Sequence, residues 1–517
     1  MTASVPPPAV TSTPAAETTG PRIAIIGAGP AGCMLARLLL HHPNPNPNPS
    51  DRHPLPKPTV TIFESDASPN YRSQGGTLDL HTSTGLAALK EAGLYDQFLS
   101  KARYDGQHME MTDKGLNTYF KINPTPARPP GPSKQQKTGE KRGSGFSDQR
   151  PEIDRADLRQ ILTESLPEGT IRWGCRVKEI SRDGKTFLFA DGRIENMGAE
   201  FDLIVGADGA WSKVRSCLLL PAGSPDPVQF SGTGGYELSI PAPASETSPA
   251  VSRLVNGGNI FVCAPGVRLV FQQLSDGSID VHPHLVKEEA DWYTTPEKCG
   301  HDAWDLGQVK KYLLEGPDAP FAKEKGWHPL LRKGIQDTGG KCTPRSLYQL
   351  PIGFRWEHRP GVTLIGDAAH LMTPSAGEGV NVALEDSMVL AREIHAAISR
   401  SNQREHGRKE GRPDWKEVFA PATKAYELEM WPRSARVAQL SHDMTRGWLF
   451  QHPREHTAVT TARNIATIIN FHAPQVLHPV VTALVYTYFL LRYLVMVARL
   501  KPEWLGSRRE RAGVTVR

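Results

Sequence analysis

The clearest pattern in the chain is a short apolar run that ends at a glycine, and it occurs three times. The runs cover residues 23–26, 203–205 and 362–365. Continuous apolar runs of this length are typical of parallel strands that are buried on both faces. The pattern therefore predicts an α/β fold whose central strands end at glycine turns.

A second pattern covers residues 226–285, where apolar and polar residues alternate between Gly, Pro and Asp turns. Alternation with period two is typical of strands that have one buried face. We expect strands at 228–240, 259–265, 268–274 and 278–286. These strands predict a separate antiparallel sheet.

The first glycine turn has the Gly-x-Gly-x-x-Gly spacing of dinucleotide-binding proteins, at Gly27, Gly29 and Gly32. Gly27 permits the tight turn, Gly29 lets a pyrophosphate approach the backbone, and Gly32 lets the next helix pack on the strand. The apolar segment 33–40 continues that helix. Its N-terminal N–H groups and dipole favour negative phosphates, so the motif predicts a nucleotide site.

An acidic residue at the end of the next strand completes this motif. The strand expected at 59–63 ends at Glu64, whose carboxylate can accept hydrogen bonds from a ribose. Glu64 lies 32 residues beyond Gly32, whereas about 20 are usual. The Pro- and Asn-rich segment 41–58, which is incompatible with a helix or strand interior, explains the difference.

The other two motifs resemble those of single-component flavin monooxygenases of the para-hydroxybenzoate hydroxylase class. Asp208 lies in GADGAWSKVR, which is similar to the Asp-Gly motif of that class. Gly366 and Asp367 lie in LIGDAAHLMTPSAGEGVN, which is similar to its Gly-Asp motif. The resemblance implies FAD as cofactor, with Asp367 binding the ribityl chain.

The residues after Asp367 fit that role on chemical grounds. Pro374 fixes a turn, and Gly377 and Gly379 let the backbone pass close to a flat ring. A long helix is expected from Asn381, with its N-terminus towards the flavin, where the helix dipole favours negative charge on a reduced ring.

Two further stretches resemble the tetracycline-degrading flavin monooxygenases and their fungal relatives. They are GGTLDLHTSTG at 75–85 and PEIDRADLR at 151–159. The resemblance implies that Asp79 and Arg159 contact FAD, with Arg159 beside the ring rather than the phosphates. It also implies that Arg72 contacts NADPH.

Three positions depart from the family pattern. Ser65 replaces an arginine that often follows the ribose-binding acid, and Glu378 replaces a glutamine and puts a charge near the ring. Ser375 replaces a bulky phenylalanine, which argues against tetracycline as substrate. Pro374, Ser375 and His370 are the candidate substrate contacts, although His370 also fits a structural role.

Composition excludes several other classes of protein. The net charge of +5 is carried by segment 127–150, with six basic and two acidic residues, and by 501–517, with five basic and two acidic residues. The rest of the chain is therefore close to neutral, which argues against nucleic acid as a partner. Six scattered cysteines without a Cys-x-x-Cys pair indicate a reducing, cytoplasmic setting and no metal site.

The most apolar window is 476–500, which is long enough to span a bilayer. Arg492 interrupts it, and basic residues follow it, against the positive-inside tendency for an enzyme whose catalytic part is cytoplasmic. Membrane contact and a buried or oligomerising helix therefore both remain open. The first 20 residues are Pro-, Thr- and Ala-rich and lack the apolar stretch of a signal peptide.

These observations predict a discontinuous Rossmann-like FAD-binding domain, an antiparallel-sheet substrate domain and a C-terminal helical extension. The expected FAD-binding segments are 21–105, 150–220 and 345–391. The substrate domain is expected at 221–344, together with a mobile insert at 106–149. The remaining parts are a disordered 1–20, bridging helices 392–450, and an apolar helix with a basic tail at 451–517.

The function that the resemblance implies is an FAD-dependent monooxygenase. NADPH reduces FAD, O₂ forms a flavin C4a-hydroperoxide, and one oxygen atom enters an electron-rich aromatic, enolic or polycyclic substrate of the secondary-metabolite type. The chemistry is carried by the flavin, so no catalytic side chain is named. A monomer or homodimer is expected. The alternatives are another flavin oxidoreductase, such as a reductase or a halogenase, and a non-catalytic membrane-attached flavin-binding subunit.

Overall fold

The structure is a computed structural model of the 517-residue chain. It describes residues 20–41, 55–69, 71, 75–104, 106, 108–122, 150–197, 201–405, 413–452 and 455–510, with only the backbone of 403–405 and 496–510. Arg72 and the segments 1–19, 42–54 and 123–149 lie outside the described residues.

A five-stranded parallel sheet forms the centre of the dinucleotide-binding part. Its order is β17-β11-β1-β2-β7, and all its neighbouring strands are parallel. The strands are β1 (Arg22–Ile26), β2 (Thr59–Phe63), β7 (Ile171–Arg172), β11 (Leu203–Gly206) and β17 (Val362–Leu364). The three glycine-terminated runs are therefore adjacent strands, and their carboxyl ends meet at one edge, where open α/β sheets bind ligands.

Helices α1 (Pro30–Leu40), α11 (Gly379–Glu405) and α12 (Trp415–Leu449) pack against this sheet and one another. Pro30 occupies the first turn of α1, where its missing N–H costs nothing. Apolar residues on nearly every side bury α1 between the sheet and α11, because a helix that is apolar all round belongs in a core. Smaller elements complete this part: β3 (Thr77–Asp79), α2 (Gly85–Glu91), α3 (Tyr95–Lys101), β6 (Glu152–Asp154), α4 (Arg155–Glu164), and the three-stranded sheet of β8 (Val177–Ile180), β9 (Thr186–Phe189) and β10 (Ile194–Asn196).

A seven-stranded sheet forms the second part, in the order β16-β12-β15-β14-β13-β4-β5. Its strands are β4 (Met109–Thr112), β5 (Thr118–Ile122), β12 (Gln229–Ile240), β13 (Asn259–Ala264), β14 (Val267–Gln273), β15 (Ile279–Val286) and β16 (Gly339–Gln349). The four expected strands are confirmed. The sheet is not wholly antiparallel, because β4 runs parallel to β13. The domain boundary expected at 344 falls inside β16.

The two faces of this sheet differ in chemistry. Alternate residues such as Leu269, Phe271 and Val281 face a core formed with the helices α6 (Pro249–Val255), α8 (Leu306–Leu314) and α9 (Pro329–Gln336). The residues between them point the other way and include Arg268, Gln272 and His284. This second face carries the polar groups of the site described below.

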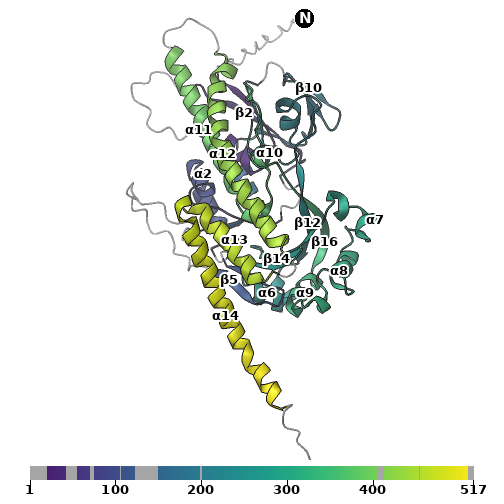
Figure 1. The fold of residues 1–517 in the computed structure, drawn as a ribbon. Helices are drawn as coiled ribbons and strands as arrows, with labels where there is room; N and C mark the ends of the chain where they lie inside the picture. The colour runs from purple at the N-terminus through teal and green to yellow at the C-terminus, as the bar shows by residue number, and fades with distance from the viewer. Residues whose placement is uncertain are drawn as a thin grey trace, which may run out of the picture.

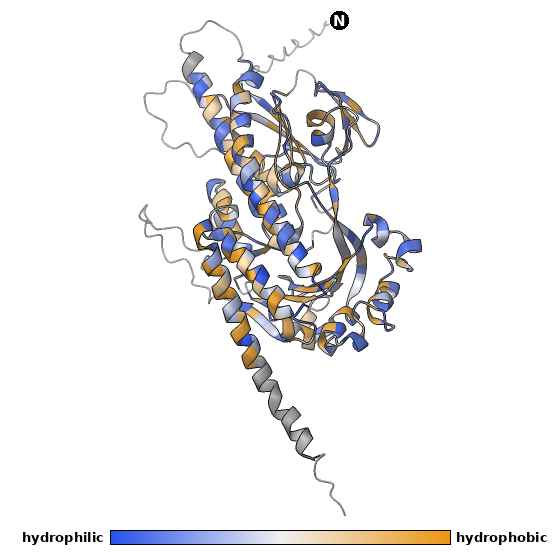
Figure 2. Ribbon diagram, in the orientation of Figure 1, coloured by the Kyte–Doolittle hydropathy of each residue, from blue (hydrophilic) through white to orange (hydrophobic). Residues whose placement is uncertain are grey.

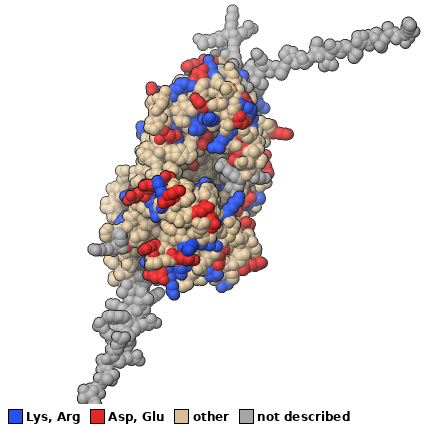
Figure 3. Space-filling view, turned by 90° about the vertical axis from the view of Figure 1, so that its right-hand side faces the viewer, with Lys and Arg blue, Asp and Glu red and all other residues tan. Residues whose placement is uncertain are grey.

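The long helix α12 runs alongside both sheets, and two further helices follow it at the C-terminal end (Figure 1). The lower half of α12 packs with α13 (Thr457–His472) against β4, β5 and β13 in a third apolar cluster. The last helix, α14 (His478–Glu510), packs along α13 and then projects beyond the body of the molecule (Figure 1). Figure 2 shows apolar residues along the outer side of this helix. On the face seen in Figure 3, basic and acidic side chains are interspersed.

Candidate functional site

The glycine turn after β1 leaves room for a ligand on one side only. Gly27 has φ of +106°, and a Cβ there would lie 2.4 Å from the Ala207 carbonyl oxygen. A Cβ on Gly32 would lie 2.1 Å from the Gly27 carbonyl oxygen, because α1 packs tightly on the turn. A Cβ on Gly29 would meet no atom within 4 Å. Gly29 therefore faces the open side of the turn, where the sequence motif predicts the pyrophosphate.

Alanine substitutions at Gly32 and Gly29 are expected to act differently. Gly32→Ala should lower the thermal stability of the apoprotein, because its Cβ overlaps backbone. Gly29→Ala should leave apoprotein stability unchanged but weaken FAD binding at least tenfold, because its methyl group would occupy the space of the phosphate. Calorimetry of the apoproteins and fluorescence titration with FAD measure the two effects. Equal FAD affinity of Gly29→Ala and wild type would contradict the assignment.

Glu64 and Arg159 lie together at the end of β2. The buried Glu64 carboxylate accepts hydrogen bonds from the N–H of Ala28 at 2.6 Å and of Asp66 at 2.8 Å. The hydroxyl of Ser65 donates to it at 2.9 Å, so Ser65 supports Glu64 where the family often has arginine. Arg159 donates to Asp66 at 2.7 Å, while its Nε and Nη1 are buried and have no hydrogen-bond partner among the described residues. Arg159 on α4 therefore pairs with Asp66 at the end of β2 in this structure, and its place beside the ring stays a prediction.

The carboxylate of Asp208 stabilises the loop in which Asp208 lies. Its carboxylate accepts from the Ser212 hydroxyl at 2.5 Å and from the N–H groups of Lys213 and Val214 at 2.6 and 3.3 Å. The loop packs against the Gly27 turn, where a Cβ on Gly27 would also approach Asp208. In this structure Asp208 shapes the cofactor turn through the backbone, and its direct contact with FAD stays a prediction.

Asp367 lies between the two ends of the predicted cofactor site. Gly366 packs against Ala31 at the start of α1, with 3.3 Å between the Ala31 Cβ and an ideal Cβ on Gly366. The Asp367 side chain is exposed and accepts no hydrogen bond from the described residues. Although the side chain is exposed, the protein atoms around it partly desolvate the carboxylate and raise the pKa of Asp367. The positive charges of His370 and Arg155 oppose that rise. An open carboxylate beside the α1 N-terminus suits the hydroxyl donors of a ribityl chain.

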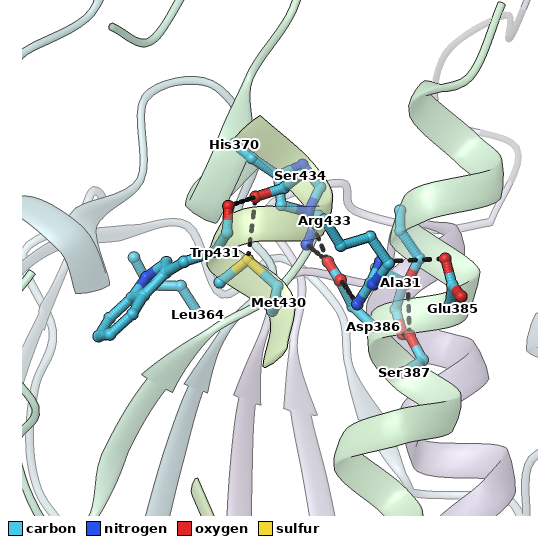
Figure 4. Close-up of polar contacts among 12 residues, drawn as sticks. Ala31, Leu364, His370, Glu385, Asp386, Ser387, Met430, Trp431, Arg433 and Ser434 are labelled. Atoms are coloured by element: carbon cyan, nitrogen blue, oxygen red, sulfur yellow. Dashed lines mark hydrogen bonds and ion pairs between the residues drawn. The ribbon is translucent and has the colours of Figure 1, made fainter. Parts of the chain in front are cut away.

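A buried polar network supports the Gly366–Asp367 turn, and Figure 4 shows its members His370, Asp386 and Arg433. The Asp386 carboxylate on α11 accepts from the Gly366 N–H at 2.8 Å and contacts His370 Nε2 at 2.6 Å. Arg433 on α12 donates to Asp386 at 3.0 Å and to Glu385 at 3.1 Å. His370 is 5% exposed, so the structure favours the structural alternative over the substrate contact.

The ring end of the site is built from Asp79, His81, Gly377, Glu378 and Asn381. The Asn381 side chain accepts from the His81 N–H at 2.8 Å and donates to the Asp79 carbonyl at 2.9 Å. It thereby ties the start of α11 to β3. An ideal Cβ on Gly377 would lie 3.6 Å from Asp79 Oδ1, and one on Gly379 would meet nothing within 4 Å. The two glycines thus leave the backbone accessible to a flat ring.

His81 lies beside Glu378, the acidic residue that stands where the family has glutamine, and offsets its negative charge. Its Nε2 lies 3.1 Å from Asp79 and its Nδ1 lies 3.2 Å from Glu378. Burial alone would lower the pKa of His81, but its hydrogen bonds to both carboxylates raise it to about 9. The charge that replaces the family glutamine is therefore neutralised by an imidazolium.

This imidazolium predicts a pH dependence of stability. Because the folded pKa of His81 lies above its usual value of 6.5, its contribution is complete below pH 6.5 and is lost as the pH rises towards about 9. The loss approaches about 3 kcal/mol, since one pKa unit corresponds to about 1.4 kcal/mol. Urea unfolding of apoprotein between pH 6 and 9.5 measures it. The variant His81→Gln should show a flatter profile, and an identical profile would contradict this role.

Opposite the ring end, the polar face of the seven-stranded sheet presents a buried cation. Arg268 on β14 is 5% exposed, and its Nη2 lies 2.8 Å from Nδ1 of His284. Its Nη1 lies 3.4 Å from the hydroxyl of Ser375, which also receives a hydrogen bond from Thr445 at 2.8 Å. Burial lowers the pKa of His282 to about 4, so this neighbour is neutral near pH 7. No carboxylate of the described residues pairs with Arg268.

Sequence reasoning missed Arg155, Arg268, His284 and Asp386. Arg155 opens α4, and its charge acts on Asp367, whereas the sequence comparison selected Arg159. The strand pattern already placed Arg268 and His284 on the polar face, since they alternate with buried residues, but alternation does not say what that face contacts. Pro374 is exposed and lines a hollow of about 520 Å³ with Trp211 and Tyr348.

The geometry fits FAD. Gly29 offers an open cradle. Among the described residues, the Asp367 carboxylate accepts no hydrogen bond, and Nε and Nη1 of Arg159 are buried without a hydrogen-bond partner. These groups follow one another in space along the carboxyl edge of the parallel sheet. They extend from Glu64, past the start of α1, to the PSAGEG turn at residues 374–379. FAD would be held with its adenosine at Glu64 and its ring near Gly377.

Comparison with known proteins supports the same cofactor. A family model described as an FAD binding domain matches residues 21–243 and 355–407. The chain is 28% identical to monooxygenase penA of Penicillium thymicola over 81% of this chain and 93% of that protein. It is 30% identical to monooxygenase asqM of Emericella nidulans over 72% of this chain and 83% of that protein.

Solved structures show the same fold. The tetracycline destructase Tet(51) covers 88% of this chain and 97% of its own length, with a TM-score of 0.54 and 17% identity. Klebsiella pneumoniae HpxO, complexed with FAD and uric acid, covers 87% of this chain and 95% of its own, with a TM-score of 0.56 and 16% identity. The chain therefore belongs to the FAD-binding-domain family and is an FAD-dependent monooxygenase.

Proposed function

We propose that the protein uses NADPH and O₂ to hydroxylate a polycyclic substrate that carries an acidic oxygen, such as a phenol or an enol. When bound, FAD supplies the redox chemistry, accepting a hydride and activating O₂. The residues of the chain bind and orient the substrate, and they exclude water from the cavity.

Arg268 is the observation that supports this substrate class. A buried charge without a counter-charge is costly, so its site is completed when an anionic group binds beside it. Its neighbours His284 and Ser375 are neutral and leave that place to a ligand. A phenolate or enolate oxygen held there would be more electron-rich than the neutral form, which favours attack on an electrophilic oxygen atom.

Apolar residues on the same face of the sheet support a large apolar skeleton. Residues Met109, Met111 and Phe261 from the sheet pack in one cluster with Ala376 of the PSAGEG turn and Met444 of α12. Methionine side chains adapt to irregular shapes. An amphipathic polycycle would place its acidic oxygen at Arg268 and its apolar rings against this cluster.

The assignment can be tested with Arg268→Ala. The variant should keep wild-type FAD content, because Arg268 contacts no predicted FAD ligand. Its KM for an acidic phenol or enol should rise at least tenfold, since a charge-assisted hydrogen bond contributes about 1.5–3 kcal/mol.

Product mass after turnover with NADPH under ¹⁸O₂ identifies the oxygen inserted, and O-methylated substrates serve as the matched control. Arg268→Lys should recover part of the loss. An equal effect of Arg268→Ala on the acidic and the methylated substrates would contradict the proposed contact. NADPH oxidation without ¹⁸O incorporation for every substrate would contradict the hydroxylation itself.

NADPH as the electron donor rests on the resemblance around Arg72, which lies outside the described residues. Comparison of steady-state rates with NADPH and NADH tests it. We further propose that the enzyme is cytoplasmic and either monomeric or homodimeric, and that it contacts a membrane through residues 476–500. The helical segment Gln475–Val495 supports the contact, because it is long and apolar enough to cross a bilayer and only 6% of it is buried.

A further inference from the structure

The apolar surface of α14 is exposed along most of the described helix. Val480, Leu484, Tyr488, Leu491 and Val495 are between 52% and 66% exposed, and they recur every three or four residues. A second exposed row contains Tyr486, Leu490 and Leu494. Soluble monomers rarely expose a contiguous apolar surface of this kind, so a partner is implied.

The other side of α14 is attached to the protein. Val485, Phe489 and Tyr493 pack in the third apolar cluster, and Phe489 is 3% exposed. Arg492 donates to the carbonyl oxygens of Tyr119 and Thr118 on the edge strand β5, at 3.2 and 3.3 Å. This part of the helix therefore lies along the body of the molecule.

These contacts are incompatible with a bilayer around the whole helix. If Gln475–Val495 crossed the membrane, the attached edge strand would enter the hydrocarbon too. That region includes the ion pair between Lys121 and Glu110 and the polar turn at Asp113, whose insertion would cost several kcal/mol per charge. A helix with one side on protein and the other in lipid avoids this cost.

We propose that α14 lies flat in the surface of an anionic membrane and does not span it, an inference that rests on the membrane contact proposed above. The sequence after the apolar surface supports a lipid partner, since 501–517 holds five basic and two acidic residues. Basic segments next to an apolar helix are attracted to anionic headgroups.

The attachment would bring the site close to the lipid. The exposed Val476 and Leu477 lie between α13 and α14. His472, at the end of α13, interacts electrostatically with Glu378 and His81, which belong to the ring end. An apolar substrate dissolved in the membrane would therefore leave the lipid near the ring end of the site.

Vesicle binding by the full-length protein tests the lipid contact. Co-sedimentation with phosphatidylcholine vesicles containing phosphatidylserine should be strong and should weaken when phosphatidylserine is omitted. The double variant Leu484→Glu, Leu491→Glu should bind at least tenfold more weakly and keep its FAD. Ile194→Glu is the matched control, because Ile194 is 70% exposed on the remote strand β10, and it should bind as wild type does.

A C-terminal epitope tag separates flat attachment from spanning. After synthesis of the protein in the presence of sealed microsomes, added protease should remove the tag together with the catalytic part. A tag protected inside the vesicles would overturn flat attachment and leave the membrane contact intact. No vesicle binding by any form would overturn both proposals. A change from dimer to monomer in the double variant, without vesicle binding by wild type, would instead assign the surface to a second copy of the chain.

Discussion

Asp367→Ala is expected to lose most of its FAD while the fold survives. The carboxylate has no hydrogen bond to lose within the described protein, so its removal costs little in the apoprotein. In the complex it should accept hydrogen bonds from ribityl hydroxyls, which contribute about 1.5–3 kcal/mol. The dissociation constant of FAD should rise about tenfold to a hundredfold. Titration of the apoprotein with FAD, followed by flavin fluorescence, gives the constant.

Two variants control this measurement. Asp367→Asn keeps an acceptor oxygen and should recover part of the affinity. Asp191→Ala removes an exposed carboxylate on the turn between β9 and β10 that is not among the proposed cofactor contacts, and should bind FAD as wild type does. Wild-type flavin content in Asp367→Ala would show that Asp367 is not a ligand.

Asp386→Ala is expected to have the largest effect on stability. Its removal leaves the charges of Arg433 and His370 without their buried partner and frees the Gly366 N–H. Breaking a buried ion pair from one side costs about 3–5 kcal/mol. The midpoint of urea unfolding should fall accordingly. FAD affinity should fall as well, because the Asp367 turn loses its support.

Glu385→Ala is the matched control for this change. Glu385 neighbours Asp386 and pairs with the same Arg433, but no hydrogen bond joins it to the Gly366 turn. It should lose far less stability and keep its FAD affinity. If both variants lost the same stability and kept the same affinity, the network would be a general brace between α11 and α12, without influence on the cofactor turn.

The fold was predictable because its signals are local. Three of the five parallel strands, β1, β11 and β17, are short and largely apolar runs that stop at or near a glycine. Gly32 must be small for reasons visible within one βα unit. The strands of the second sheet alternate as expected. The pairing of β4 and β16 within the second sheet was not predicted, because pairing between distant segments depends on contacts that a local sequence pattern does not contain.

The cofactor ligands were proposed from motifs, but their environment was not. His370 follows the Gly-Asp pair directly, yet its partner Asp386 lies on the next long helix and Arg433 on the one after that. The alternation of β14 put Arg268 on a polar face, but its lack of a carboxylate partner is a property of three-dimensional packing. Arg155 and Arg159 lie one helical turn apart on α4, and sequence alone does not say which of the two acts on Asp367.

The long helix α12 makes the two sheets depend on one another during unfolding. Its 35 residues extend about 50 Å. The first half supplies Phe419, Tyr426 and Met430 to the core around the parallel sheet. The second half supplies Leu440 and Met444 to the cluster beside the other sheet. Melting either core would remove the packing partners of one half of this helix. Heat should therefore unfold both parts in a single calorimetric transition, and loss of FAD should lower the stability of the seven-stranded sheet.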